Sequence, residues 1–168
     1  MHSRIFEISK TPVDENERFS SSDIPDNFYH SVADYTDDAV DRFEDIKWLI
    51  SGLKSIISKE EGDKFIFKEG YKQIYFRRKH SEFVSKAAEL SRVSLDVFCG
   101  DESSVYPMDM EMFKLRGLYD EHFEFYVYFE DELMTLDYWI RHYDLSGTLY
   151  VGGIVVSVKA KRGLSAKK

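Results

Sequence analysis

The chain is poor in features that would place it outside the cell or in a membrane. It has one cysteine, Cys99, which excludes an internal disulfide framework and is typical of a reducing compartment. Its most apolar stretch, Tyr150 to Val158, is shorter than the roughly 20 residues that a membrane-spanning helix needs. The first residues contain no apolar run of the kind found in secretion signals. We therefore expect a soluble cytoplasmic protein.

Motifs with a specific chemistry are also missing. The sequence contains no His-Glu-x-x-His, no Cys-x-x-Cys and no glycine pattern that could surround a phosphate. The Gly152-Gly153 pair lies inside a strand-like pattern, where glycines are typical of a bulge. The sequence therefore predicts no cofactor, and it assigns neither catalytic residues nor metal ligands.

Negative charge is concentrated in the first part of the chain. The formal net charge is −8. Residues 1–46 hold twelve acidic and four basic residues, whereas residues 47–168 hold nineteen of each. Basic residues predominate again in residues 159–168, which we expect to form a frayed tail. Such a separation of charge favours a surface that selects partners by the sign of their charge.

Changes in apolar spacing predict an α+β fold in a single domain of residues 1–168. Spacings of three and four predict three helices, near residues 38–58, 81–93 and 131–143. In the first, Val40 and Phe43 share the apolar face with Ile46, and Asp37 or Asp38 serves as the N-cap. Alternating segments predict about five to six strands in a mostly antiparallel sheet with the helices on one face.

Six segments are the predicted strands. A first strand covers residues 4–8, and residues 148–159 form a last strand with a bulge at its two glycines. One hairpin joins residues 64–68 to 71–76, and another joins residues 112–118 to 123–129. Residues 10–36 contain two of the three prolines and no sustained period, so we expect an irregular acidic segment held by Phe28, Tyr29 and Tyr35.

The acidic residues around the first helix are the leading functional candidates. Spaced carboxylates can imitate the phosphates of a nucleic acid and occupy a basic groove on a protein that handles nucleic acid. The interpretation that competes with this one is that they only cap the helix, complement its dipole and keep the segment soluble. The predicted partner-binding set is Asp34, Asp37, Asp38, Asp41, Glu44 and Asp45.

In size and charge the chain resembles the small acidic accessory proteins that phages and other mobile elements use against restriction or CRISPR systems. This resemblance concerns composition and includes no specific motif. It implies a non-enzymatic inhibitor that mimics DNA and binds a basic nucleic-acid-handling protein or ribonucleoprotein.

Three alternatives stay open. A small metal-dependent hydrolase or nuclease could use the acidic and histidine side chains of residues 120–144, because carboxylate and imidazole are suitable metal ligands. Direct nucleic-acid binding could use Arg77, Arg78 and Lys79, although the acidic pI near 5.2 opposes it. An assembly subunit could use an exposed sheet face rich in tyrosine, with Tyr126 and Tyr128. The residues of the hydrolase alternative are Asp120, His122, Asp137, His142 and Asp144.

Overall fold

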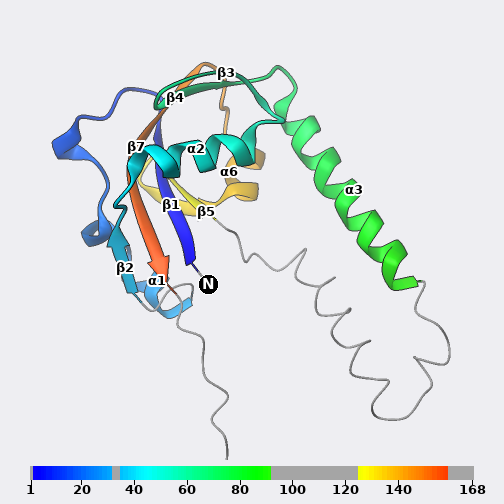
Figure 1. Ribbon diagram of the computed structural model, residues 1–168, viewed down its shortest axis with the longest axis horizontal. Helices are drawn as coiled ribbons and strands as arrows, with labels where there is room; N and C mark the ends of the chain where they lie inside the picture. Colours follow the sequence, from blue (N-terminus) through cyan, green and yellow to red (C-terminus); the bar gives the residue numbers. More distant parts are fainter. Residues whose placement is uncertain (1, 32–34, 92–124, 159–168) are drawn as a thin grey trace, which may run out of the picture. The chain divides into compact units, whose positions relative to one another are not determined.

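The structure is a computed structural model that describes residues 2–31, 35–91 and 125–158 (Figure 1). The chain divides into two compact units, residues 1–69 with 123–168, and residues 70–122. In the second unit the described part is one helix, α3 (Tyr71–Ser91). In the described residues no helix has the length and apolar character that crossing a membrane requires.

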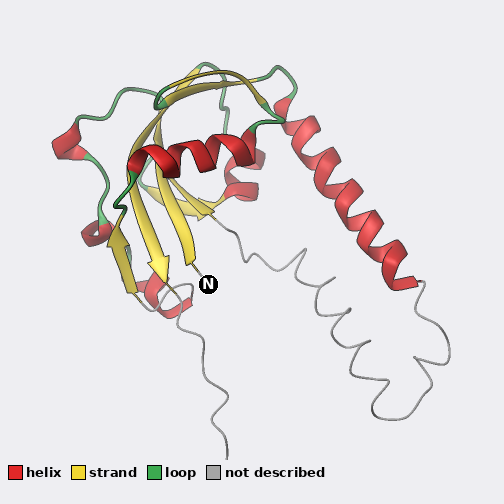
Figure 2. Ribbon diagram, in the orientation of Figure 1, coloured by secondary structure: helices red, strands yellow, loops and turns green. Residues whose placement is uncertain are grey.

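The first unit contains one open sheet with three α-helices and two short 3-10 turns in its described residues (Figure 2). The helical elements are η1 (Glu15–Glu17), η2 (Ser21–Asp23), α1 (Asp26–Ser31), α2 (Arg42–Leu53) and α6 (Leu136–His142). The strands are β1 (His2–Ser9), β2 (Tyr35–Asp38), β3 (Ile57–Glu61), β4 (Lys64–Phe67), β5 (Phe125–Phe129), β6 (Glu132–Thr135) and β7 (Thr148–Val158).

The sheet confirms the α+β class and its mostly antiparallel pairing. Its order is β3-β4-β7-β1-β5-β6, with β2 paired to β7, and β1 and β5 form a parallel pair. The described part has seven strands where five to six were expected, and four α-helices where three were expected. Strands β2, β3 and β6 were not predicted, and neither was helix α1, which lies in the segment expected to be irregular.

Strand β7 is the centre of the sheet, and its long length lets it serve three neighbours. One edge pairs with β1 along most of its length. The opposite edge is shared, since residues 148–150 pair with β4 and residues 155–158 pair with β2. Between these two partners, no strand of the described residues pairs with residues 151–154 of β7 on that edge.

The predicted bulge lies in this gap and is confirmed. Phe6 is opposite Ile154 and Ile8 is opposite Val151, so Glu7 alone faces the two glycines. The Glu7 carboxylate accepts hydrogen bonds from the backbone N–H of Gly153, at 2.5 Å, and of Phe19, at 2.9 Å. The extra residue of the bulge is therefore held by a side chain rather than by a neighbouring strand.

Both faces of the sheet are covered. Helices α2 and α6 lie on one face, where Trp48 contacts Phe125, with 5.3 Å between ring centroids, and Trp139 contacts Phe129 at 5.8 Å (Figure 1). On the other face the segment of residues 10–31 is docked by aromatic contacts. Its Phe19 stacks on Tyr128 with centroids 4.1 Å apart, and its Phe28 meets Tyr126 edge-on at 5.5 Å.

Several sequence predictions need correction because of this docking. The expected exposed tyrosine face is wrong, since Tyr126 is buried and Tyr128 lies under Phe19. The segment at residues 10–36 contains η1, η2 and α1, so it is not wholly irregular. Phe28 anchors it as expected, but Tyr35 is exposed, and the side chain of Tyr29 lies outside the described residues.

The first helix is shorter than the predicted range of residues 38–58. Residues 35–38, which precede the helix, pair with β7, and the N–H of Ala39 also donates to the carbonyl of Ile154 at 3.1 Å. The N-cap is therefore Asp41, whose carboxylate accepts the N–H of Glu44 at 3.1 Å, and not Asp37 or Asp38. At the other end Ile57 begins β3.

The hairpins differ from the prediction as well. β4 pairs with β3 around Gly62, which has φ +61°, so the expected partner at residues 71–76 is wrong. Those residues belong to α3, which also includes most of the helix expected at 81–93. β5 pairs with β6 and β1, while residues 112–118 lie outside the described residues. α6 begins five residues later than the helix predicted at 131–143, because β6 precedes it.

Replacement of Gly153 by alanine tests the bulge. A Cβ at this position would overlap the backbone of Phe19, so Gly153→Ala should lower the free energy of unfolding by about 1–3 kcal/mol. Gly52→Ala is the control, because its Cβ would meet Phe125 at an ordinary 3.4 Å inside a helix, where alanine is preferred. Urea titration should find the control at least as stable as the wild type. Equal stability of both variants would contradict the geometry.

The turn between β5 and β6 allows a second test. Glu130 and Asp131 both have positive φ, at 50° and 64°, which costs a side chain about 1–2 kcal/mol in each case. Asp131→Gly should therefore be more stable than Asp131→Ala by about 1 kcal/mol, as measured by thermal or urea unfolding. Both variants lose the same contact to Tyr128, so the difference between them measures the conformational cost of positive φ at residue 131. Equal stabilities would show that the turn is unstrained.

Candidate functional site

The predicted carboxylates lie around β2 and the first turn of α2, not on one stripe of a helix. Asp34 lies outside the described residues. Asp37 and Asp38 are exposed neighbours on a strand, so their side chains point to opposite faces of the sheet. Asp38 accepts the N–H of Ser21 at 2.7 Å, which directs it toward η2, while Asp37 accepts the N–H of Asp38 at 2.9 Å.

Asp41 and Glu44 are exposed at the start of α2. Asp41 caps the helix, and Glu44 is 3.3 Å from the amine of Lys47 in a pair whose side chains are each 62% exposed. Such exposed contacts contribute little to stability, about 0–1 kcal/mol. Both carboxylates therefore remain accessible to another molecule.

Asp45 has a different role from the one predicted. It is 7% exposed and forms an ion pair with the Nε of Arg4 on β1. The guanidinium of Arg4 also lies over the ring of Trp48, 5.1 Å from its centroid. The prediction that Asp45 faces a partner is wrong, because this carboxylate joins α2 to the sheet.

Apolar side chains are exposed among these carboxylates. Val40 is 101% exposed and Phe43 is 68% exposed, although their spacing predicted burial. Val40 is exposed because it precedes the helix, which starts at Arg42. Phe43 lies to one side of the buried face of α2, which is formed by Asp45, Ile46, Leu49 and Leu53. We name Asp37, Val40, Asp41, Phe43 and Glu44 the acidic–apolar surface.

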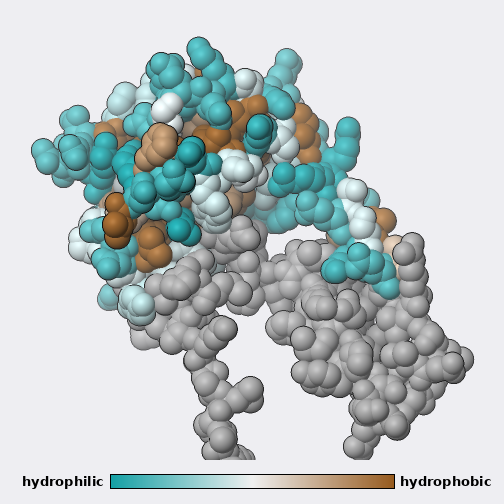
Figure 3. Space-filling model, viewed as in Figure 1, coloured by the Kyte–Doolittle hydropathy of each residue, from teal (hydrophilic) through white to brown (hydrophobic). Residues whose placement is uncertain are grey.

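A groove continues from this surface along α2. It has a volume of about 670 Å³ and runs between the helix and the turn that joins β3 to β4. Figure 3 shows apolar atoms at the surface over this region, surrounded by hydrophilic ones. We name it the α2 groove; its apolar side chains are Phe43, Ile46 and Ile50, and its charged rim is Lys47, Lys54, Glu60 and Asp63.

Arg42 ties this surface to the bulge of β7. Its guanidinium donates to the carbonyl of Val151 at 2.5 Å and to that of Gly152, and it lies 3.7 Å from the carboxylate of Asp63. Burial lowers the pKa of Arg42, and the nearby charge of Arg18 lowers it further, while Asp63 opposes the change. The side chain fills the gap between β4 and β2, so the start of α2 is fixed to the central strand.

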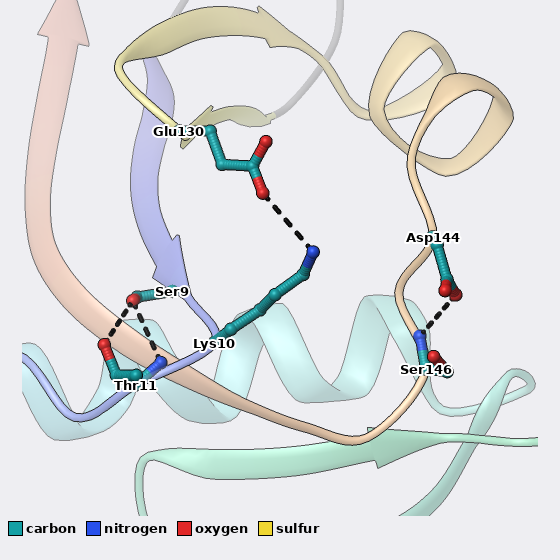
Figure 4. Close-up of polar contacts among 6 residues, drawn as sticks. All are labelled: Ser9, Lys10, Thr11, Glu130, Asp144 and Ser146. Atoms are coloured by element: carbon teal, nitrogen blue, oxygen red, sulfur yellow. Dashed lines mark hydrogen bonds and ion pairs between the residues drawn. The ribbon is translucent and has the colours of Figure 1, made fainter.

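The residues of the hydrolase alternative lie only partly within the described residues. Asp120 and His122 lie outside the described residues. His142 packs on the ring of Tyr138, with centroids 4.2 Å apart, and Asp137 is half-buried on the same helix. Asp144 turns back to accept the N–H of Ser146 at 3.0 Å, as Figure 4 shows. Across residues 2–31, 35–91 and 125–158, no three His, Cys, Asp or Glu residues are grouped as a metal site would require.

The basic run lies on α3 rather than after a hairpin. Arg78 is 3.5 Å from Glu82, and the cations of Arg78 and Lys79 lie 5.8 and 5.7 Å from the centroid of the Tyr75 ring. Arg77 is exposed on the same helix. Direct nucleic-acid binding through these residues stays a prediction. The basic residues 159–168 lie outside the described residues.

One sequence signal could have identified the exposed apolar residues. Asp41 and Glu44 have the spacing of a capping box, in which a capping side chain precedes an acidic residue by three positions. That spacing starts the helix at Arg42 and leaves Val40 outside it. The groove had no such signal, because Glu60 and Asp63 come from a hairpin that the apolar pattern did not predict.

Asp45 and Glu44 form a matched pair for testing which carboxylate stabilises the fold and which is only exposed. Asp45→Asn removes the charge from a part-buried bond to Arg4, so it should lower the free energy of unfolding by about 1.5–3 kcal/mol. Glu44→Gln changes an exposed carboxylate next to it in the chain and should change stability by less than about 0.5 kcal/mol. Chemical denaturation measures both values. Similar losses for the two variants would show that Asp45 is not a structural carboxylate.

Comparisons with known proteins identify no relative of this chain. No family model matches it, and no curated protein and no solved structure matches it either. Any functional inference therefore depends on the residues and contacts of the chain itself.

Proposed function

We propose that this protein is a non-enzymatic interaction module that inhibits or regulates a basic, nucleic-acid-handling partner. The observation that carries the proposal is the acidic–apolar surface, where Val40 and Phe43 are exposed beside accessible carboxylates. Three of the six large apolar side chains exposed in the described part of the chain lie between residues 35 and 43. Grouped exposed apolar residues with a polar rim are typical of protein-binding sites.

The two kinds of side chain have different effects on binding. The carboxylates attract a cationic surface and accelerate association, as the phosphates of a nucleic acid would. Their individual ion pairs contribute little once formed, so charge alone selects a partner only weakly. Val40 and Phe43 add apolar area that is removed from water on binding, about 25 cal/mol per Å². The combination favours a protein partner whose basic groove has apolar positions.

Neutralising the exposed carboxylates tests the proposal. The test variant is Asp37→Asn, Asp38→Asn, Asp41→Asn and Glu44→Gln, in which asparagine at position 41 keeps the helix cap. The control neutralises Glu61, Glu69, Glu82 and Glu130, four exposed acids elsewhere that give the same change in net charge. We expect immobilised wild type and control to retain the same host protein from a lysate, and the test variant to bind it at least about tenfold more weakly.

Two further measurements on that retained protein identify the mechanism. Higher salt should weaken binding, because screening removes the attraction between charges more than about 8–10 Å apart. Excess duplex DNA should displace the partner if both molecules occupy one basic groove. Binding that resists the neutralisation, salt and DNA alike would contradict the proposal.

A further inference from the structure

The α2 groove lies beside the carboxylates and offers a different kind of contact. Its apolar positions recur along one flank of α2, at residues 43, 46 and 50, with residues 47, 51 and 54 on the rim. These spacings of three and four place the apolar side chains on one stripe of the helix, with Phe43 exposed, Ile50 half-buried and Ile46 at the base of the groove, 8% exposed. The flank of the helix that lines the groove, from residue 43 to 54, extends about 16 Å, close to three helical turns. The groove therefore has the length and spacing of a helix-binding site.

The two rims of the groove have opposite charge. The helix rim carries Lys47 and Lys54, seven residues apart, and the hairpin rim carries Glu60 and Asp63. Asp63 is 3.7 Å from Arg42 and Lys47 is 3.3 Å from Glu44, whereas Glu60 and Lys54 are exposed. A complementary segment needs basic residues on its Glu60 side and acidic residues on its Lys54 side.

An extended peptide is a poorer occupant than a helix. A peptide that added to the sheet here would pair with β3, which begins the strand order and has β4 as its neighbour. β3 carries Lys59, Glu60 and Glu61, all exposed, and charged side chains on an edge strand oppose the addition of another strand. The apolar surface in this region lies on the helix side instead.

We propose that the α2 groove binds an amphipathic helix of the partner protein, with its apolar stripe on Phe43, Ile46 and Ile50. The flank of that helix facing the hairpin rim is basic, and the flank facing Lys54 is acidic. The inference rests on the proposed function in one respect, that the partner is a protein. It goes beyond the proposed function because an apolar stripe is a feature that a nucleic acid does not have.

A designed peptide is the probe. It is a helix of about fifteen residues, lactam-bridged on its outer face so that it is helical when free, with leucines at helical spacing, lysines on one flank and glutamates on the other. One control peptide has the same composition in scrambled order, and another has the two charged flanks exchanged. Fluorescence anisotropy measures binding of each labelled peptide to the full chain.

Two protein variants locate the binding. Phe43→Ala removes an exposed apolar side chain, and Ser51→Trp places a large ring in the groove from an exposed position, so both should fold. Each should weaken peptide binding by at least about fivefold, roughly 1 kcal/mol. Tyr138→Ala removes another exposed aromatic ring, on α6 and outside the groove, and should leave binding unchanged.

The outcomes separate this inference from the proposed function. The inference is supported if the designed peptide binds more strongly than both control peptides and if both groove variants weaken its binding. Absence of binding, equal binding of the scrambled peptide, or indifference to both variants overturns it. Self-association of the free protein that Ser51→Trp abolishes also overturns it, because a second copy would then be the occupant. The fourfold neutralised protein should still bind the peptide within about threefold, since Glu60 and Lys54 are unchanged.

Discussion

The bulge in β7 is the constraint on which the rest of the first unit depends. Because two glycines face one residue of β1, the backbone of β7 has groups that are not satisfied by any strand in the described part of the chain. The carboxylate of Glu7 accepts a hydrogen bond from the N–H of Gly153, and the guanidinium of Arg42 donates hydrogen bonds to the carbonyls of Val151 and Gly152. A buried backbone group without a partner is costly, so both side chains are needed where they are.

These two side chains also connect segments that are distant in sequence. Glu7 accepts the N–H of Phe19 and so holds the covering segment over Tyr128. Arg42 is the first residue of α2, and its contacts with β7 determine where that helix can begin. Val40 is exposed because it lies before this start, and Phe43 is exposed because it lies beside the buried face of the helix. The acidic–apolar surface is thus a consequence of how the central strand is completed.

The acidic residues of the first third serve several purposes at once. Asp41 caps a helix, Asp23 and Asp38 accept backbone N–H groups, and Asp45 binds Arg4 inside the unit. These contacts account for part of the charge excess without a partner. The carboxylates that stay accessible lie where apolar side chains are also exposed, and that coincidence favours binding over simple solvation.

The sequence by itself determined the α+β class, the first and last strands and the glycine bulge, because each depends on alternation or on residue type within a short segment. Tertiary structure decided the rest. Pairing of β2 with β7 moved the start of α2, so Val40 lies before the helix and is exposed instead of buried. Residues 71–76 alternate like a strand, yet β4 pairs with β3, and they join a helix. The tyrosines of β5 were expected to be exposed, but a segment about a hundred residues earlier covers them. The spacing of apolar residues indicates which side chains prefer burial. The segment that buries them is determined by long-range strand pairing, which local spacing does not encode.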